Sequence, residues 1–356
     1  MRIAAVGAGF PDHYYDQETL LAAFRSHWEA RYFNVERIEQ LHRNVLVGGR
    51  HLALAMEEYP ALAGFGAAND AWIRVATEVG ARAVADGLAR AGLGVEDVDA
   101  LFFVSVTGIA TPSIDARLIN RMGLPTRMKR IPIFGLGCVA GAAGIARAAD
   151  YVRGFPDEVA VLLSVELCSL TLQREDLSIP NLIASGLFGD GAAAAIVVGE
   201  ERARRAGGEL AAAPEVVATR SIFYPDSERV MGWDISERGF QIVLSADVPR
   251  VVDEHLRADV DLFLADQGLT RRDIASWVAH PGGPKVLEAM ERALEAPQGA
   301  LDLTWRSLAE VGNLSSTSVL LVLRDTLAER RPPAGSLGLL VALGPGFCSE
   351  LVLLRW

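Results

Sequence analysis

One cysteine sits at a turn where it could perform nucleophilic chemistry on a carbonyl group. Cys138 follows an apolar run at residues 131–134 and precedes a helical pattern rich in small residues. At a helix N-terminus the free N–H groups and the dipole stabilise a thiolate, so we expect the pKa of this thiol to be lowered. Judged on this segment alone, a buried and unreactive cysteine is an equally good interpretation.

A histidine and an asparagine occupy comparable turns further along the chain. His280 ends a short apolar strand and precedes a stiff Pro-Gly-Gly-Pro turn, a position that suits a site residue or a structural one equally. Asn313 follows Gly312 and precedes a Ser/Thr-rich helix start, where helix capping is the commoner role of asparagine. The alternative role is an amide that donates to a carbonyl or enolate oxygen. Together with the cysteine, these residues form a specific set.

Strands and helices that would position these residues alternate along the chain. Apolar, β-rich runs predict strands at residues 2–7, 100–106, 159–165, 192–198, 215–224, 239–245, 276–279, 338–343 and 350–355. Helical patterns predict helices at residues 17–30, 70–91, 141–154, 248–268, 283–294 and 315–329. Asp16 is expected to cap the first helix and Gly92 to end the second. Buried strands between helices indicate an α/β chain whose sheets are covered on both faces.

The chain is long enough for two fused units. It has 356 residues, and a domain usually has about 150. The stretch 200–214 mixes charges with Gly-Gly and Pro, so we place a boundary there, between residues 1–210, which carry the cysteine, and 211–356, which carry the histidine and asparagine. Segments 188–199 and 343–354 each run from a glycine-containing turn into a strand, which is weak evidence for duplication.

Composition and charge exclude several classes of protein. Hydrophobic residues make up 51% of the chain, which excludes disorder, and three cysteines exclude a disulfide scaffold. The net charge of −11 argues against general nucleic-acid binding. No apolar stretch reaches the roughly 18 residues of a spanning helix. The first residues predict a strand rather than a signal peptide. The three cysteines are widely spaced with no CxxC pair, so we expect a reduced, cytoplasmic setting. A dinucleotide fingerprint at Gly7 and Gly9 lacks its third glycine.

Five ordered segments resemble one family, the type III polyketide synthases, which are the chalcone and stilbene synthases of the thiolase fold. The segments are GLGCVAGAAG, GLFGDGAAAAIVVG, HPGGPKVLE, GNLSSTSVLLVL and LGPGFCSELVLLRW. The resemblance runs from about Val6 to Trp356. It implies two αβαβα halves in a five-layered core, and a homodimer with one active site per subunit.

The resemblance also implies roles for the site residues. Cys138 matches the nucleophile that takes a starter acyl group from CoA and then carries the growing chain. His280 matches its ion-pair partner and, with Asn313, the group that stabilises the enolate formed when malonyl-CoA loses CO₂. Phe188 matches an aromatic gate between the CoA tunnel and the cavity, with core packing as the alternative. No metal or redox cofactor is implied.

Further positions match the family's substrate cavity, although ordinary packing explains most of them equally well. They are Val106, Thr111, Cys168, Thr171, Trp233, Ile242, Ser315, Gly344, Pro345 and Gly346. The loop of Thr111 crosses the dimer axis in the family, often through a cis peptide, so we expect a cis bond before Pro112. Arg43 and Arg50 fall in the family's basic CoA-binding segment and are candidates for holding the CoA phosphates.

The substrate implied by these positions is a long fatty acyl starter. Ile242 stands where many members carry a second gating phenylalanine. The smaller aliphatic side chain of isoleucine widens the cavity mouth and keeps it apolar. The residues around Cys138 and Cys168 most resemble those of bacterial alkylpyrone and alkylresorcinol synthases, which extend long fatty acyl starters. An apolar cavity suits such a starter, because each buried CH₂ contributes roughly 0.8 kcal/mol. One alternative is a 1,3,6,8-tetrahydroxynaphthalene synthase-like enzyme that uses malonyl-CoA as starter; that sub-type tends to carry extra cysteine where Val106 and Thr171 stand. Others are a β-ketoacyl-acyl-carrier-protein synthase III and an inactive partner subunit.

Overall fold

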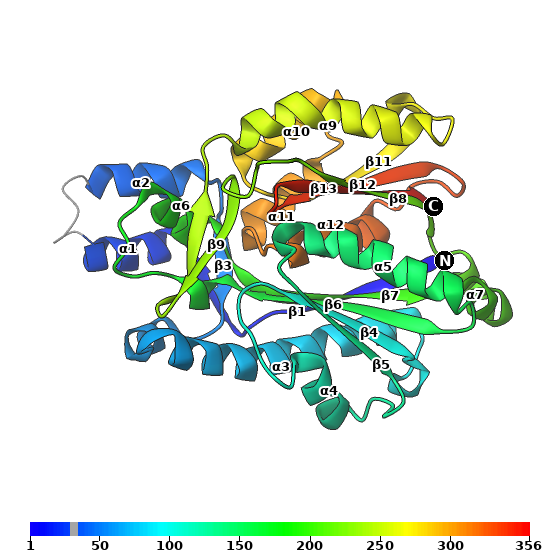
Figure 1. Cartoon of the computed structure of the whole chain (residues 1–356), viewed down its shortest axis with the longest axis horizontal. Coiled ribbons are helices and arrows are strands. Elements are labelled where there is room, and N and C mark those ends of the chain that lie inside the picture. Colours follow the sequence, from blue (N-terminus) through cyan, green and yellow to red (C-terminus); the bar gives the residue numbers. More distant parts are fainter. Residues whose placement is uncertain (29–34) are drawn as a thin grey trace.

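Two β-sheets lie one above the other in the computed structural model, which describes residues 1–28 and 35–356 (Figure 1). One sheet contains β1 (Arg2–Gly9), β4 (Ala100–Ser105), β5 (Lys129–Phe134), β6 (Val159–Leu167) and β7 (Asp190–Val198). The other contains β8 (Glu215–Phe223), β11 (Ile274–Ala279), β12 (Leu337–Gly344) and β13 (Cys348–Arg355). The sheets join where Arg2 pairs with Glu215, so the strand order β11-β12-β13-β8-β1-β7-β6-β4-β5 is continuous.

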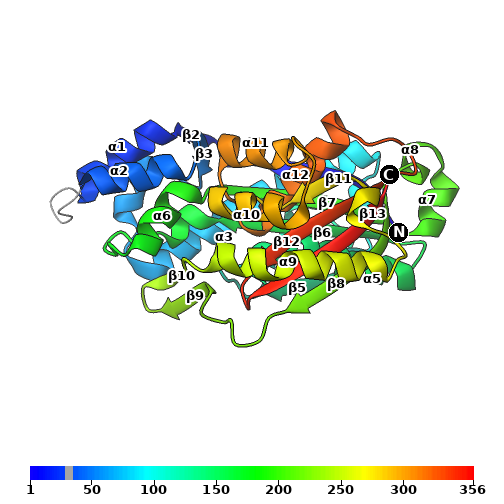
Figure 2. The same ribbon diagram turned by 90° about the horizontal axis from the view of Figure 1, so that it is seen from above.

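Helices cover both outer faces and also fill the space between the sheets. The outer helices are α3 (Gly64–Ala91) and α4 (Ile114–Met122) on one side, and α9 (Val248–Ala265) and α10 (Pro284–Leu294) on the other (Figures 1 and 2). The central helices are α5 (Ala140–Gly154) and α12 (Ser316–Glu329). Every residue of β6 and β7 is buried, as expected for strands covered on both faces. The five-layered αβαβα arrangement is therefore confirmed.

The two central helices approach each other closely because α5 begins with small residues. A Cβ placed on Gly141 would lie 2.3 Å from the backbone oxygen of Ser316, so only glycine fits at this crossing. The crossing brings the first turns of α5 and α12 together. As a result, the residues that immediately precede these two helices meet in the middle of the molecule.

A further group of elements gathers at the end of the molecule opposite the chain termini (Figures 1 and 2). It comprises α1 (Gln17–Trp28), α2 (Val35–Asn44), α6 (Ile179–Leu187) and the hairpins β2 (His13–Asp16)–β3 (Gly49–Leu52) and β9 (Met231–Ser236)–β10 (Gly239–Leu244). The helix α11 (Asp302–Val311) lies beside α12, nearer the middle of the molecule. Two short helices, α7 (Glu200–Ala206) and α8 (Gly208–Ala211), occupy the stretch expected to link the halves. The division after residue 210 stays a prediction.

Most predicted elements are present with shifted ends. Gly92 ends α3 in the left-handed conformation, with φ 66°, and Asp16 caps α1 by accepting from the Thr19 N–H at 2.8 Å. The expected helix 17–30 is described to Trp28, and its last two residues lie outside the described residues. Short elements such as β2, β3, α4 and α6 were not predicted, because four to nine residues rarely show a clear period. No helix in residues 1–28 or 35–356 is both long and apolar enough to span a membrane.

Candidate functional site

The predicted nucleophile lies on a sharp elbow between β5 and α5. Cys138 is the middle residue of a short 3₁₀ helix, η3 (Gly137–Val139), and its side chain is 6% exposed. Gly137 has φ 57°, and a Cβ there would lie 2.5 Å from the Pro345 ring. A Cβ on Gly344 would lie 2.7 Å from the Val139 nitrogen. The predicted Gly-Pro-Gly loop therefore packs directly on the elbow, and glycines on both sides make room for it.

Hydrogen bonds connect Asn313 to the thiol and to the histidine loop. The Cys138 Sγ–H donates to Ser315 Oγ at 3.5 Å, and the Ser315 N–H donates to Asn313 Oδ1 at 2.8 Å. Asn313 Nδ2 donates to the Gly282 carbonyl at 3.3 Å. This is an Asx turn rather than the helix cap that we considered. A side-chain amide has two N–H bonds, so one remains for a ligand.

The predicted histidine is buried at the end of β11 and is 2% exposed. The backbone N–H of His280 donates to the Val341 carbonyl at 2.9 Å, and its backbone carbonyl accepts from the Gly282 N–H at 2.9 Å. Within the described residues, Nδ1 of His280 has no hydrogen-bond partner. Burial lowers the pKa of this imidazole to about 3. A buried polar atom without a partner is uncommon in a folded protein and suits a ligand site.

The expectation that the pKa of Cys138 is lowered was wrong for the thiol on its own. Burial raises the pKa of Cys138 to about 12, and the hydrogen bond with Ser315 offsets only part of that shift. The helix start cannot compensate because α12 and the Gly-Pro-Gly loop exclude water from the thiol, and a thiolate loses more from desolvation than it gains from one helix terminus. The sequence does not show this burial, because residues about 200 positions away cause it.

A buried carboxylate near the thiol was not predicted. Glu166, in β6, accepts hydrogen bonds from the Val106 N–H at 3.1 Å, from Thr107 Oγ1 at 3.0 Å and from the Ser316 hydroxyl. Burial raises its pKa, and its negative charge in turn raises the pKa of Cys138 and of Cys168. The available indication was one acidic residue in an otherwise apolar strand, VAVLLSVEL.

Cys138 and His280 can ionise together as a thiolate–imidazolium pair. Because the two charges cancel, burial disfavours forming the pair less than it disfavours forming either charge alone. If His280 is the ion-pair partner, the rate of Cys138 alkylation by iodoacetamide should reach its plateau near neutral pH. In His280→Gln the pKa set by burial, about 12, governs the thiol, so alkylation should keep rising into strongly alkaline pH. The measurement is the alkylation rate against pH, with the exposed His255→Gln as control. Superimposable profiles for wild type and His280→Gln would remove His280 from this role.

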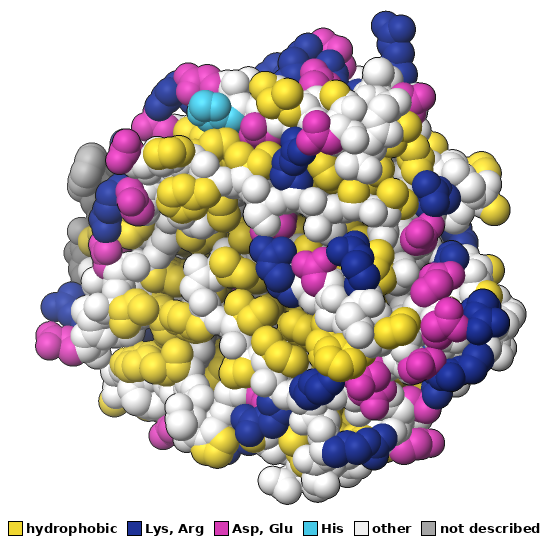
Figure 3. All heavy atoms as spheres, turned by 45° about the vertical axis from the view of Figure 1, so that its right-hand side comes forward, with side chains coloured by type: hydrophobic (Ala, Val, Ile, Leu, Met, Phe, Trp, Pro, Cys, Tyr) yellow, Lys and Arg dark blue, Asp and Glu magenta, His cyan; other side chains and the backbone are white. Residues whose placement is uncertain are grey.

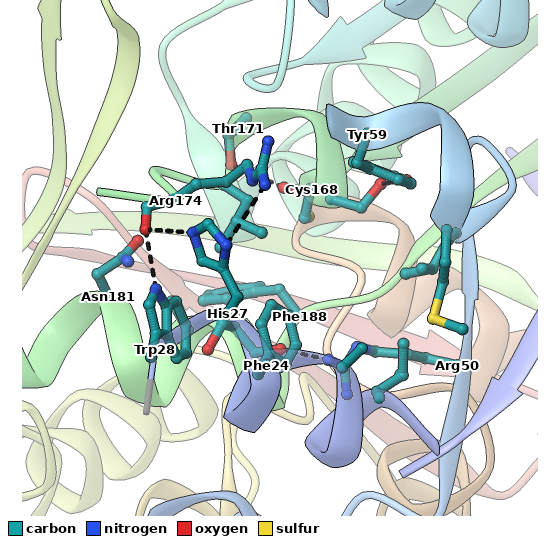
Figure 4. A pocket seen from close by; sticks show the side chains of 18 of the residues that line it. Phe24, His27, Trp28, Arg50, Tyr59, Cys168, Thr171, Arg174, Asn181 and Phe188 are labelled. Carbon is teal, nitrogen blue, oxygen red and sulfur yellow. Dashed lines mark hydrogen bonds between the residues drawn. The ribbon is translucent and has the colours of Figure 1, made fainter. Parts of the chain in front are cut away.

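A cavity of about 390 Å³ lies next to Phe188 (Figure 4). Cys138, His280 and Asn313 are not among the described residues that line it. The predicted residues that line it are Cys168, Thr171, Phe188, Trp233, Ile242 and Arg50. Phe188 also adjoins Asn313, because the Asn313 N–H donates to the Leu187 carbonyl at 2.9 Å and the Gly189 N–H donates to the Asn313 carbonyl at 3.0 Å. Phe188 therefore stands between the cavity and Asn313. Its role as a gate stays a prediction.

The remaining predicted cavity residues lie elsewhere around the site. Val106 is buried, and its N–H bonds to Glu166. Ser315 contacts the thiol, while Gly344, Pro345 and Gly346 form the loop at the elbow. Thr111 lies on an exposed loop, and the bond to Pro112 is cis, as expected. Whether that loop reaches a second subunit stays a prediction.

The two arginines predicted to bind CoA phosphates have protein partners. Arg50 is 1% exposed and donates to the carbonyls of Ser185 and Gly186 and to Gln17 Oε1. Its role in CoA binding stays a prediction. Arg43 is exposed on α2 and pairs with Glu18 and Glu39, each at 3.7 Å. Figure 3 shows acidic and basic side chains interspersed over one outer face, with no large basic patch on that face.

Positive charge is instead concentrated inside the cavity. The cations that line it are Arg50 and Arg174, whereas none of the described residues that line it is Asp or Glu. His27 also lines it, as a neutral ring that accepts from Arg174. Arg174 Nη2 lies 3.4 Å from His27 Nδ1, and Figure 4 shows the guanidinium reaching over that ring. This is unusual in a chain with 45 acidic and 34 basic residues, and it favours an anionic ligand. The described part of the chain contains no cluster of three His, Cys, Asp or Glu side chains that could hold a metal ion.

Comparisons with known proteins match nearly the whole chain. Family models described as chalcone and stilbene synthases match residues 1–201 (N-terminal domain) and 215–356 (C-terminal domain). A 1,3,6,8-tetrahydroxynaphthalene synthase of Streptomyces peucetius subsp. caesius is 51% identical over 99% of this chain and 93% of that enzyme. A putative chalcone synthase of Bacillus subtilis (strain 168) is 37% identical over 99% of this chain and 98% of that protein. The solved structure of a 1,3,6,8-tetrahydroxynaphthalene synthase from Streptomyces coelicolor A3(2), described as a bacterial type III polyketide synthase, has a TM-score of 0.92 at 31% identity and covers 100% of this chain and 99% of that one.

Proposed function

The chain belongs to the chalcone and stilbene synthase family of type III polyketide synthases, and on that premise we propose that it builds an aromatic polyketide from malonyl-CoA alone. In this proposal malonyl-CoA supplies the starter as well as the extender units, and the product is 1,3,6,8-tetrahydroxynaphthalene or a close relative of it. The observation that carries this choice of starter is the cavity lined by two arginines without a carboxylate among its described residues. The 51% identity to a tetrahydroxynaphthalene synthase supports it.

The proposed reaction uses Cys138, His280 and Asn313 in turn. The thiolate of Cys138 attacks the thioester carbonyl of the starter, the carbon–sulfur bond to CoA breaks, and the released CoA thiolate takes the proton of the His280 imidazolium. A second malonyl-CoA then loses CO₂, and the free N–H of Asn313 together with His280 stabilises the enolate oxygen, each contributing ~2–4 kcal/mol. The enolate carbon attacks the acyl group on Cys138, which releases the thiolate and leaves the longer chain on CoA. Every step is acyl transfer, loss of CO₂ or carbon–carbon bond formation, so none of them needs an external oxidant or reductant.

A malonyl starter differs from a fatty acyl starter by a free carboxylate at its far end. A carboxylate in a partly buried cavity must be paired with a cation or with hydrogen-bond donors. Arg174 supplies such a cation at one wall of the cavity, and Arg50, in β3, adds a positive potential at another part of the wall. We therefore propose that the cavity holds the carboxylate end of the growing chain while its thioester end lies at Cys138. As in the family, we expect the enzyme to act as a homodimer.

The second candidate is the long-chain alkylpyrone or alkylresorcinol synthase that we preferred from the sequence. The observation in its favour is the apolar part of the cavity wall, which includes Leu20, Phe24, Leu52, Met56 and Ile242. Such a wall suits an alkyl chain. A β-ketoacyl synthase III would use a similar thiol site but would stop after one condensation.

Purified protein given malonyl-CoA alone should form a naphthalene tetrol, because no separate starter is needed. Mass spectrometry of the products identifies it, and parallel reactions with added hexanoyl-CoA or palmitoyl-CoA provide the comparison. Alkylpyrones from the acyl-CoA reactions, with no product from malonyl-CoA alone, would overturn the malonyl starter. A single β-keto product would instead indicate the synthase III reaction.

Arg174→Gln sharpens this test. The variant should lower the loading of malonyl groups on Cys138 by about tenfold or more, the effect of losing one charge-assisted hydrogen bond, and should leave hexanoyl loading unchanged. Intact-protein mass spectrometry measures both forms of the loaded enzyme, and Arg153→Gln, on the exposed face of α5, is the matched control. Equal losses for both acyl groups would place the Arg174 contact on CoA rather than on the starter carboxylate.

A further inference from the structure

Arg50 is a buried cation whose hydrogen-bond acceptors in the described part of the chain are all uncharged. It is 1% exposed in β3, and the buried Asp190 attracts it electrostatically without lying within ion-pair distance. Burial lowers the pKa of this guanidinium to about 10, so it remains charged at neutral pH. Taking such a charge out of water costs several kcal/mol unless polar groups of the protein replace the water. The groups that replace it show what this residue does.

The replacing groups belong to the end of α6. Nη1 donates to the Gly186 carbonyl at 2.8 Å, and Nη2 donates to the Ser185 carbonyl. These are among the last carbonyls of the helix, where the negative end of the dipole attracts a cation. Gln17 completes the arrangement, because its Oε1 accepts from Arg50 and its Nε2 donates to the same Gly186 carbonyl at 3.0 Å.

The segment directly after α6 is joined to Asn313 on both sides. The Leu187 carbonyl accepts from the Asn313 N–H, and the Gly189 N–H donates to the Asn313 carbonyl, so Phe188 and Asn313 form a β-bridge. A Cβ placed on Gly189 would lie 2.4 Å from the Val311 carbonyl and 3.1 Å from Cβ of Arg50. Residues 187–189 are therefore held between Arg50 on one side and residues 311–313 on the other.

We propose that Arg50 is a positioning residue that fixes the end of α6 and, through it, the place of Asn313 in the site. This inference rests on the proposed role of Asn313 as a donor to the enolate oxygen. Cys138 is held by the η3 elbow and the Gly-Pro-Gly loop, and its only link to Asn313 in the described residues is the long hydrogen bond through Ser315. Loss of Arg50 should therefore impair the decarboxylation of malonyl-CoA while leaving the acylation of Cys138 intact.

The test compares two partial reactions in Arg50→Met and Arg50→Lys. Release of CO₂ from malonyl-CoA gives kcat and KM for decarboxylation, and mass spectrometry of the loaded protein gives the single-turnover rate of Cys138 acylation by hexanoyl-CoA. We expect Arg50→Met to lower the kcat of decarboxylation by about tenfold or more at unchanged KM, with acylation at the wild-type rate. The kcat of decarboxylation in Arg50→Lys should lie between those of wild type and Arg50→Met, because an ammonium group can reach one of the two carbonyls. Arg90→Gln, which removes an exposed arginine at the end of α3, should change neither reaction.

The split between the two reactions separates positioning from general stability. A purely structural role would lower both reactions by the same factor, and that result would overturn the proposal, as would wild-type decarboxylation in folded Arg50→Met. If Arg50→Met does not fold, Gln17→Leu provides a milder variant, because it removes the second donor to the Gly186 carbonyl. It should lower the kcat of decarboxylation by a smaller factor and leave the rate of Cys138 acylation unchanged. The test does not depend on the natural starter. Wild-type protein that fails to release CO₂ would contradict the proposed function rather than this inference.

Discussion

Replacing Cys138 by alanine is expected to abolish chain extension, lowering polyketide formation by about 10⁴-fold or more, as for other enzymes that lose their nucleophile. The reason is that no other group at the site can carry the acyl chain. Ser315, whose hydroxyl touches Cys138 Sγ, is a far weaker nucleophile without an adjacent base. Product formation from malonyl-CoA, followed by mass spectrometry, measures the loss. Decarboxylation of malonyl-CoA should survive at a measurable rate, because Asn313 and His280 remain.

The other two cysteines provide matched controls. Cys168 lines the cavity, and burial raises its pKa well above the usual value, while Cys348 lies beside the Gly-Pro-Gly loop with its pKa raised by burial to about 11. Neither Cys168→Ala nor Cys348→Ala should stop chain extension, although Cys168→Ala widens the cavity and can change chain length. Polyketide products from Cys138→Ala would remove this residue from the nucleophile role. Alkylation no faster at Cys138 than at the other two would point the same way.

Features that depend on a few neighbouring residues were predictable from the sequence. The elbow at Cys138 follows from glycines before it and small residues after it, and the same small residues allow the close crossing at Gly141. The end of α3 at Gly92 needed only the left-handed conformation that glycine adopts easily. The buried strands β6 and β7 are apolar along most of their length, which indicates cover on both faces, although Glu166 and Asp190 interrupt the pattern.

Features set by distant packing were not predictable in the same way. The raised pKa of Cys138 comes from water exclusion by α12 and by the loop after β12, neither of which its own segment indicates. Arg50 was recognisable as a basic residue, but only the fold places it beneath the end of α6 instead of at a tunnel mouth. The charge of the cavity depends on α1, β3 and the loop before α6, which are far apart in the sequence. This is why the sequence alone favoured an uncharged starter.

The second large effect is expected at Asn313. Asn313→Ala should lower the rate of malonyl-CoA decarboxylation by about 10²–10³-fold, the usual effect of removing one donor to a developing oxyanion. Acylation of Cys138 should continue, since the thiol does not need this amide. Release of CO₂ and the mass of the loaded protein measure the two reactions separately. Alanine also removes the oxygen that accepts from the Ser315 N–H, so this variant alone does not separate the donor from the turn.

Asn313→Asp makes that separation. An aspartate keeps an oxygen for the Ser315 N–H, so the turn and the place of Ser315 beside the thiol are preserved. Ionised, it has no N–H to donate and places a negative charge beside the enolate, so the loss of decarboxylation should equal or exceed that of Asn313→Ala. If the residue mattered only for the shape of the turn, Asn313→Asp would decarboxylate at nearly the wild-type rate, and the free N–H would have no part in the reaction. Near-complete loss in both variants, with Cys138 still acylated, therefore assigns the effect to the amide donor.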